Sequence, residues 1–384
     1  MLNQIGEALL TSAGILWKSF WALMFGYIVS AAIQVIVTRS QMARVLGKRG
    51  WKQAILAGVF GFISSSCSFA AIAASRSVFV KGAHPVNSLS FLIASTNLVI
   101  ELGIVLWVLL GWKFFVGNFL LGILMIFYAY ILTRFWFPRE LANEAKQHAQ
   151  QRQEGEGMHH HTQMQNKNWW QKLTSKEGWR AISHAFFMEW KMAYKEILFG
   201  FTIAGFISVF IPTSFWNTLF LQSGQDAPSL FAILENALVA PVIAFFTFIG
   251  SMGNVPLAAL LWSKNASFAG VMSFLGADLV AATVVYLQAK YYGWKYAVYL
   301  SGLLYICMVA AGITVHGIFA LFNVIPTQRT ALTELVRFAI DYTFWLNIIF
   351  AVIGGILLWM HFKDNDSEYH QQHREEHSQQ ETAN

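Results

Sequence analysis

Long apolar runs recur along this chain, from Ile15 to Trp359, and they constrain its fold more than any other feature. A helix that crosses the hydrocarbon core of a bilayer needs about 20 apolar residues. Charged residues make up 12% of the chain, whereas soluble domains carry roughly 25%. We therefore predict an all-α, polytopic helical membrane protein and exclude an ordinary soluble domain.

The apolar runs predict where the chain crosses the membrane. In the first half they predict three spans, at Ala13–Val37, Val86–Leu110 and Phe114–Phe137. A hairpin at Gln53–Val80 lies between the first and the second of these spans. In the second half they predict four spans, at Ile197–Leu221, Phe268–Gln288, Tyr296–Phe319 and Ala339–Met360. An interrupted segment at Leu230–Trp262 follows the first of these spans.

Five segments follow from this pattern. They are a first membrane repeat at 1–137, a cytoplasmic polar loop at 138–195, a second membrane repeat at 196–320, an additional C-terminal span at 321–362 and a disordered cytoplasmic tail at 363–384. The loop is polar, Gln-rich and mixed in charge, so we expect partial disorder there, with an amphipathic helix from Trp179 onward.

Two apolar segments are interrupted by polar or small residues. Phe60–Ala74 contains four serines and Cys67 between Ser64 and Ser68, and Phe245–Leu257 contains Gly, Ser and Asn in the same way. Lipid supplies no water to a broken backbone, so irregular chain at this depth must be buried in protein or line a cavity. We predict that the two breaks face each other and form a substrate path.

The distribution of basic residues decides how the first break enters the membrane. Arg39–Lys52 carries five Lys and Arg residues, which places this loop on the cytoplasmic side. A single crossing by Gln53–Val80 would put the basic loop at 138–195 outside. A re-entrant hairpin keeps both loops inside, so we predict a multi-pass protein of the cell inner membrane with the large loop and C-terminus cytoplasmic.

Short sequences also recur about 183 residues apart. Ser90–Leu92 is repeated at Ser273–Leu275, and Gly111–Phe114 resembles Gly293–Tyr296. In the predicted topology the two copies run in opposite directions through the membrane. Inverted repeats with broken helices are typical of secondary transporters. The repeats therefore predict two halves, each with a re-entrant or broken-helix hairpin.

Four motifs carry a family resemblance: Ser65–Ser77, Lys81–Ala83, Phe91–Gly103 and Gly250–Ala259. With these motifs the chain resembles the ArsP-type predicted permeases, membrane transporters that include organoarsenical efflux proteins. The resemblance implies a permease, and export as the direction of transport. Cys67 matches the position implicated in binding trivalent arsenic. Members usually have a second cysteine where this chain has Ser65.

We predict that both breaks and one residue of a neighbouring span bind the substrate. These residues are Ser64, Ser65, Ser66, Cys67, Ser68, Asn97, Gly250, Ser251, Gly253, Asn254 and Pro256. A thiolate suits soft, thiophilic species, although a buried cysteine can equally be an apolar filler. We expect the two glycines to allow unusual backbone angles and the proline to occupy the first turn of a half-helix.

Acidic residues within the predicted spans indicate ion coupling. A carboxylate at the centre of a span costs about 2.5–3.5 kcal/mol on insertion scales, so it normally faces a cavity or a partner. We predict that Glu101 and Asp278 carry coupling protons or contact a cationic substrate. Asn97 and Glu101 have i, i+4 spacing and should share one helix face. The alternative is a structural hydrogen bond to a neighbouring helix.

The remaining motifs favour no cofactor. The histidines of the loop and tail lie in polar segments without a defined ligand set, so we predict no metal site there. No phosphate-binding loop occurs. Cys307 has apolar neighbours and is interpreted as packing. The expected partners are a small-molecule substrate and the lipid bilayer, without nucleic acid, and a homo-oligomer stays open.

Two other functions stay open beside the ion-coupled permease. One is an intramembrane enzyme with Cys67 or a nearby serine as nucleophile. Such an enzyme needs a base within hydrogen-bond reach, but no histidine lies in the apolar core near the motif, since His84 is on a loop and His316 is far along the chain. The other is a non-transporting scaffold subunit, which has no need of two polar breaks. We therefore predict that the chain is not an enzyme.

Overall fold

The computed structural model describes residues 2–36, 50–64, 68–80, 82–136, 138–153, 175–220, 229–247, 249–329 and 342–382. Within these ranges the regular structure is helical, with no β-strand. Seven of the described helices are long and apolar enough to cross a membrane. The predicted class of polytopic helical membrane protein is therefore confirmed.

The helices of the first half precede the polar loop. They are α1 (Leu2–Ile36), α3 (Trp51–Ser64), α4 (Ser68–Val80), α5 (Pro85–Asn97), α6 (Ile100–Leu110), α7 (Trp112–Phe135) and α8 (Arg139–Gln153). The second half contains α10 (Lys176–Phe210), α11 (Thr213–Leu219), α12 (Leu230–Thr247), α13 (Ser251–Ser263), α14 (Phe268–Leu275), the 3₁₀ helix η1 (Gly276–Val280), α15 (Ala282–Tyr292), α16 (Trp294–Leu321) and α18 (Tyr342–Thr382).

The order and packing of the helices repeat. α3 packs on α5 as α12 packs on α14, and α5 packs on α7 as α14 packs on α16. α4 and α13 each have 13 residues, and α6 and α15 each have 11. Gly111 follows the last residue of α6 and Gly293 follows the last residue of α15. Their φ angles of 96° and 87° favour glycine. The direction of each half through the membrane stays a prediction.

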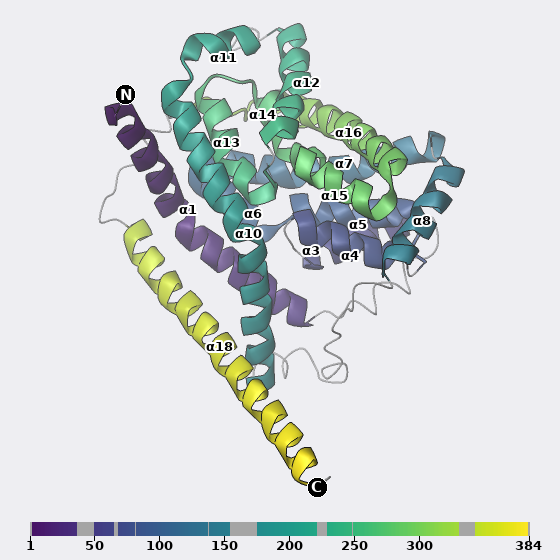
Figure 1. Ribbon diagram of the computed structural model, residues 1–384. Coiled ribbons are helices and arrows are strands. Elements are labelled where there is room, and N and C mark those ends of the chain that lie inside the picture. The colour runs from purple at the N-terminus through teal and green to yellow at the C-terminus, as the bar shows by residue number, and fades with distance from the viewer. Residues whose placement is uncertain are drawn as a thin grey trace.

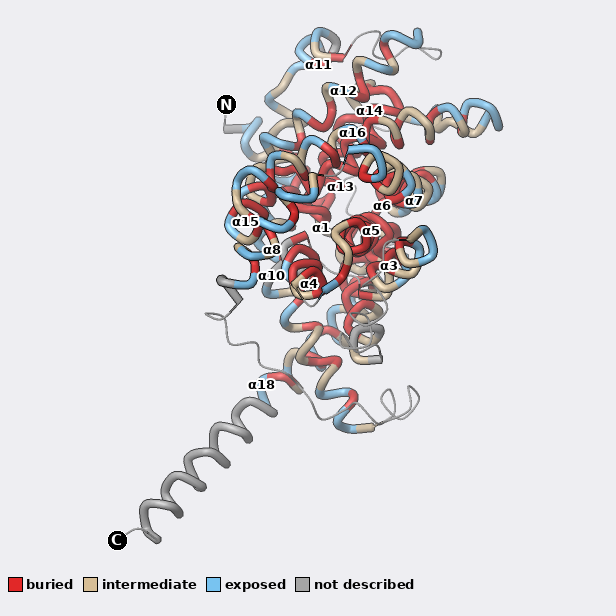
Figure 2. Tube along the Cα trace, turned by 90° about the vertical axis from the view of Figure 1, so that its right-hand side faces the viewer, coloured by how far each residue is buried: buried red, intermediate tan, exposed pale blue. Residues whose placement is uncertain are grey.

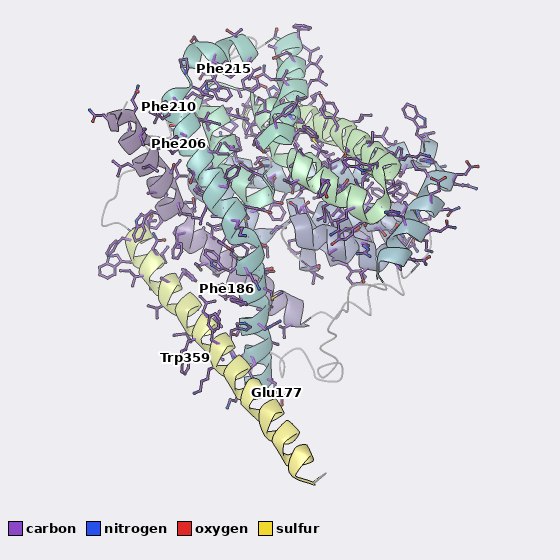
Figure 3. The ribbon with its side chains drawn as sticks, in the orientation of Figure 1. Glu177, Phe186, Phe206, Phe210, Phe215 and Trp359 are labelled. Atoms are coloured by element: carbon purple, nitrogen blue, oxygen red, sulfur yellow. The ribbon has the colours of Figure 1, made fainter. Side chains whose placement is uncertain are left out.

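Three long helices, α1, α10 and α18, pack against one another beside the remaining bundle (Figure 1). α18 carries exposed apolar residues from Trp345 to Trp359 at helical spacing. Figure 3 shows Trp359 on the outer side of α18 and Phe186 between this helix and α10. A helix with such an exposed apolar stripe fits contact with lipid.

The centre of the bundle is formed by short helices that are buried on every side. All residues of α14 are buried, as are the residues of α13 from Ser251 to Trp262 (Figure 2). At a rise of 1.5 Å per residue, a helix of 13 residues is about 20 Å long. α13 is therefore shorter than the bilayer core, and protein, rather than lipid, surrounds it.

Small residues bring the helices of the core into backbone contact. A methyl group on Gly200 of α10 would lie 2.6 Å from the Cα atom of Gly253 of α13. A methyl group on Gly61 of α3 would overlap the carbonyl oxygen of Phe91 of α5. Close backbone approach at small residues is how helices associate where lipid gives no hydrophobic drive.

Three of the predicted spans are broken, and the one at Ile197–Leu221 is interrupted at Pro212, between α10 and α11. Val86–Leu110 divides into α5 and α6, which meet at an angle of 40°, and Phe268–Gln288 divides into α14, η1 and α15. At each of the last two breaks an amide side chain donates to a backbone carbonyl, from α7 in the first case and from α15 of the same span in the second. Asn118 Nδ2 donates to the Asn97 carbonyl at 2.8 Å, and Gln288 Nε2 donates to the Leu279 carbonyl at 3.1 Å.

The polar segments contain more helix than the sequence predicted. α8 occupies the start of the loop at 138–195, and α10 begins at Lys176, three residues before the predicted Trp179. α18 continues to Thr382, across the tail for which disorder was predicted. Its Gln, Glu, Lys and Arg residues have good intrinsic helix propensity.

Arg76 attaches α8 to the membrane part. Its Nη2 atom donates to the Ala149 carbonyl at 3.1 Å, and its guanidinium lies 4.4 Å from the ring centre of Tyr291. The side chain is buried, and it joins α4, α8 and α15 at one point. These contacts make Arg76 a link between α8 and the membrane helices.

Candidate functional site

The two chain breaks lie side by side in the core. α3 ends at Ser64 and α4 begins at Ser68, while α12 ends at Thr247 and α13 begins at Ser251. The hydroxyl oxygens of Ser68 and Ser251 are 2.7 Å apart, within hydrogen-bond distance. The Ser251 amide also donates to Ser68 Oγ at 3.3 Å. The start of one half-helix therefore touches the start of the other.

Asp278 of η1 joins both serines. Its Oδ2 atom accepts hydrogen bonds from Ser251 Oγ at 2.5 Å and from Ser68 Oγ at 3.4 Å. The residue is 1% exposed, and its Oδ1 atom has no hydrogen-bond partner among the described residues. The side chain of Asn97 lies close enough to interact with the same carboxyl group. A buried carboxyl thus holds the junction of the breaks together.

Glu196 of α10 is part of this site, although the sequence did not predict it. Both of its carboxylate oxygens are buried, and they have no hydrogen-bond partner among the described residues. A methyl group on Gly250 would overlap this carboxyl group, so Glu196 faces the residue that precedes α13. Asp278 binds Ser251, the residue that follows Gly250, so the carboxyl groups of Glu196 and Asp278 contact consecutive residues.

Glu101 reaches the junction from a different side. It lies in the first turn of α6 and is 2% exposed. A cavity of about 10 Å³ lies beside it and is lined by Tyr27, Thr96, Val99, Glu101, Leu102, Ser251 and Met252. This volume is about what one water molecule needs. The cavity connects Glu101 with the serine that binds Asp278.

The predicted i, i+4 arrangement of Asn97 and Glu101 is wrong. Asn97 is the last residue of α5, whereas Glu101 belongs to α6. The chain between them is extended at Val99, with φ −76° and ψ 132°. The two residues consequently reach the junction from the ends of two helices rather than from one helix face.

The geometry of the second break also differs from the prediction. Gly250 has a φ of −87°, and Gly253 lies within regular helix, so neither uses a left-handed backbone. Their role is close contact with α10. Pro256 lies inside α13, beyond its first turn. Asn254 is 1% exposed, and its amide oxygen and nitrogen have no hydrogen-bond partner among the described residues.

Part of the predicted site lies outside the described residues. This part consists of Ser65, Ser66 and Cys67. Ser64, the last residue of α3, is buried. Cys307 is a free, fully buried cysteine on α16, in agreement with a packing role.

The junction combines acidic groups with a helix terminus. Glu101, Glu196 and Asp278 approach the start of α13 from α6, α10 and η1, and a helix N-terminus carries partial positive charge. Among the described residues, no group of three or more His, Cys, Asp or Glu residues could hold a metal ion. The arrangement can bind protons or polar groups of a small solute.

A family model described as a predicted permease, of the ArsP type, matches residues 4–317. This match covers most of the chain and includes both breaks, so it decides the family. The chain belongs to this family of predicted permeases. Together with the seven candidate spans, the match identifies a multi-pass membrane permease.

The permease is also similar to a curated protein of Mycobacterium tuberculosis (strain ATCC 25618 / H37Rv) with the name "Putative permease Rv2963". The two are 38% identical over 363 residues, which cover 93% of this permease and 88% of the relative. No solved structure matches the chain.

Proposed function

We propose that the permease exports a small solute by ion-coupled alternating access, and that the solute is a thiophilic, organoarsenical-like compound. The contact of Ser68, Ser251 and Asp278 carries this proposal. It joins two broken segments from different halves of the chain at a buried carboxyl group. Buried ionisable groups within membrane segments usually mark substrate or ion pathways.

The two halves support alternating access. Their helices follow the same order and pack in the same way, as expected for a transporter built from two repeats. In the proposed mechanism the halves rock around the junction of α4 and α13. The junction then opens to each side of the membrane in turn, with the central loop and C-terminus on the cytoplasmic side of the inner membrane.

The chemistry of the breaks supports the class of solute. The N-termini of α4 and α13 meet at Ser68 and Ser251, and their backbone N–H groups favour an electron-rich group. Cys67 immediately precedes Ser68 in the sequence and supplies the soft sulfur atom that a trivalent arsenical prefers. The family resemblance supports export rather than uptake.

Transport by purified permease in vesicles tests this proposal. Vesicles that contain the permease should accumulate a trivalent methylarsenical when a proton gradient is imposed, and empty vesicles should not. Cys67→Ser should abolish or retune this transport, whereas Cys307→Ser should leave it unchanged. If vesicles with the wild-type permease take up the arsenical no faster than empty vesicles, the proposed substrate is contradicted.

Labelling of single cysteines tests the proposed topology. A cysteine at Ser77 should react with a membrane-impermeant reagent only from the cytoplasmic side, and one at Ser267 only from the outside. Both residues lie beyond the breaks, at the far end of α4 and at the start of α14. Reaction of both positions from one side would refute the opposed hairpins.

A further inference from the structure

We propose that Glu196 and Asp278 form a carboxyl pair that binds the coupling proton, and that the amide of Asn254 is the group available to hydrogen bond with this pair as its protonation state changes. The inference deepens the proposed function, because it names the ion and the residues that bind it. Three elements bring the groups together: α10, η1 and α13. Two observations carry it: the two carboxyl groups contact the consecutive residues Gly250 and Ser251, and the buried amide of Asn254 has no hydrogen-bond partner among the described residues.

The packing of α10 on α13 aims Glu196 at the junction. Glu196 and Gly200 are four residues apart, so they share one face of α10. Gly200 contacts Gly253, and the carboxyl of Glu196 lies against Gly250. Close approach at these glycines brings the carboxyl of Glu196 against the backbone of Gly250. The carboxyl therefore stays beside the residue that precedes Ser251.

The neighbourhood of Glu196 offers negative charge and little compensation. α10 packs against α1, α13 and α18. α13 has no charged residue, α18 has no Lys, Arg, Asp or Glu between Tyr342 and Phe362, and α1 carries only Glu7 and Lys18.

For Asp278, the neighbouring groups are hydroxyls and an amide rather than a cation. Ser251 and Ser68 donate to its Oδ2 atom, and Asn97 interacts with the carboxyl. Its Oδ1 atom has no hydrogen-bond partner among the described residues. Both carboxyl groups contact the start of α13 and are buried, so ionising both costs more than ionising one, and one shared proton removes this cost.

Asn254 lies where it can serve both carboxyl groups. It follows Gly250 by four residues and Ser251 by three, so it lies above both on α13. Gly250 contacts Glu196, and Ser251 binds Asp278. The amide is 1% exposed and has neither a donor nor an acceptor partner among the described residues. An amide can donate to a carboxylate and accept from a carboxylic acid, so it suits a pair that changes protonation state.

The proposed step is a simple proton equilibrium. A proton that enters from one side of the membrane forms an O–H bond with a carboxylate oxygen of the pair, and one negative charge is lost. After the halves rearrange, the O–H bond breaks and the proton leaves to the opposite side. No oxidant, reductant or other reactant is required.

Infrared spectroscopy of the full-length permease in lipid tests proton binding directly. During a pH titration, the wild type should show a carbonyl-stretch band of a protonated carboxylic acid that appears as the pH falls. Glu196→Gln and Asp278→Asn should each remove or shift this band, and Glu196→Asp should retain it. Glu189→Gln is the matched control, because Glu189 is a buried acid on the same helix that already binds Ser30 Oγ at 2.7 Å.

Transport in the same vesicles then tests coupling. Glu196→Gln should lose accumulation of a trivalent methylarsenical driven by a pH gradient but keep exchange of this compound across the membrane. If wild-type vesicles move none of the compound, the proposed function fails, while the infrared band still decides the proton site. A band unchanged in Glu196→Gln would overturn the inference. A second result would also overturn it: sodium, but not choline, raises the stability of the permease, this effect requires Glu196, and no band titrates with pH.

Discussion

The hydrogen bonds between the two breaks should stabilise the permease by a measurable coupling energy. Ser68 Oγ contacts Ser251 Oγ at 2.7 Å, the Ser251 amide at 3.3 Å and Asp278 Oδ2 at 3.4 Å. Ser251→Ala removes the hydroxyl that bridges Ser68 to the carboxyl group. Ser68→Ala removes the partner on α4. Together the two changes form a double-mutant cycle across the junction.

The expected magnitudes follow from what each hydroxyl binds. A hydrogen bond to a charged group contributes about 1.5–3 kcal/mol in soluble proteins. Between membrane helices the measured couplings average about 0.6 kcal/mol and reach about 1.7 kcal/mol. Because Ser251 Oγ lies only 2.5 Å from Asp278 Oδ2, we expect Ser251→Ala to lower the free energy of unfolding by about 1–3 kcal/mol. We expect a coupling energy of about 0.6–1.7 kcal/mol with Ser68→Ala.

Reversible unfolding in bicelles measures this coupling. Ser90→Ala is the matched control, since Ser90 is a buried serine whose hydroxyl donates to the Val86 carbonyl within α5, at 2.9 Å. Its effect should add to that of Ser251→Ala within about 0.3–0.5 kcal/mol. Additive effects for Ser68→Ala and Ser251→Ala would refute a direct bond between the two breaks.

Three further predictions concern the packing around the site. Gly253→Ala should lower the free energy of unfolding by about 1–3 kcal/mol and reduce transport, because α10 leaves no space for a methyl group; Gly302→Ala, where a methyl group meets no atom within 4 Å, is the control in the same unfolding assay. Gly293→Ala should cost about 1–3 kcal/mol from backbone strain alone, since its φ is 87° and its surroundings are open; an unchanged unfolding free energy would contradict this. Arg76→Gln should release α8 and speed its limited proteolysis, whereas Arg134→Gln, at an exposed position, should not.

The sequence signals for the residues at the junction are local. Serines and glycines inside apolar runs are visible without tertiary information, and a carboxyl group within a span is costly enough to imply a partner. Asp278 was predicted to be functional on that argument, and the structure places it on Ser68 and Ser251. The helical class follows equally directly from the lengths of the apolar runs.

Glu196 could not be predicted from its local sequence. It follows Lys195 at the border between the polar loop and an apolar run, where charges usually belong to the membrane surface. Its importance comes from contact with Gly250, a residue far along the chain. The available signal was the spacing of four residues between Glu196 and Gly200, which places both on one helix face. This spacing indicates a site only when the helix that packs against it is known.

No Gly or Pro follows Asn97 or Val280 to indicate a break, although Gly276 directly follows the last residue of α14. Side chains of Asn118 and Gln288, located on other helices, bind the carbonyls of Asn97 and Leu279. These bonds replace helical bonds that the sequence pattern led us to expect. Long apolar runs therefore predicted the spans correctly but overestimated their continuity.

A disulfide across the junction tests the central claim most directly. Ser68→Cys and Ser251→Cys, introduced together in a permease with Cys67→Ala and Cys307→Ala, place two thiols where the hydroxyl oxygens are 2.7 Å apart. With a protease site inserted between residues 154 and 174, oxidation should keep the two halves linked after cleavage and stop proton-driven exchange across the membrane until a reductant is added. Halves that separate after oxidation and cleavage would show that the two breaks do not meet.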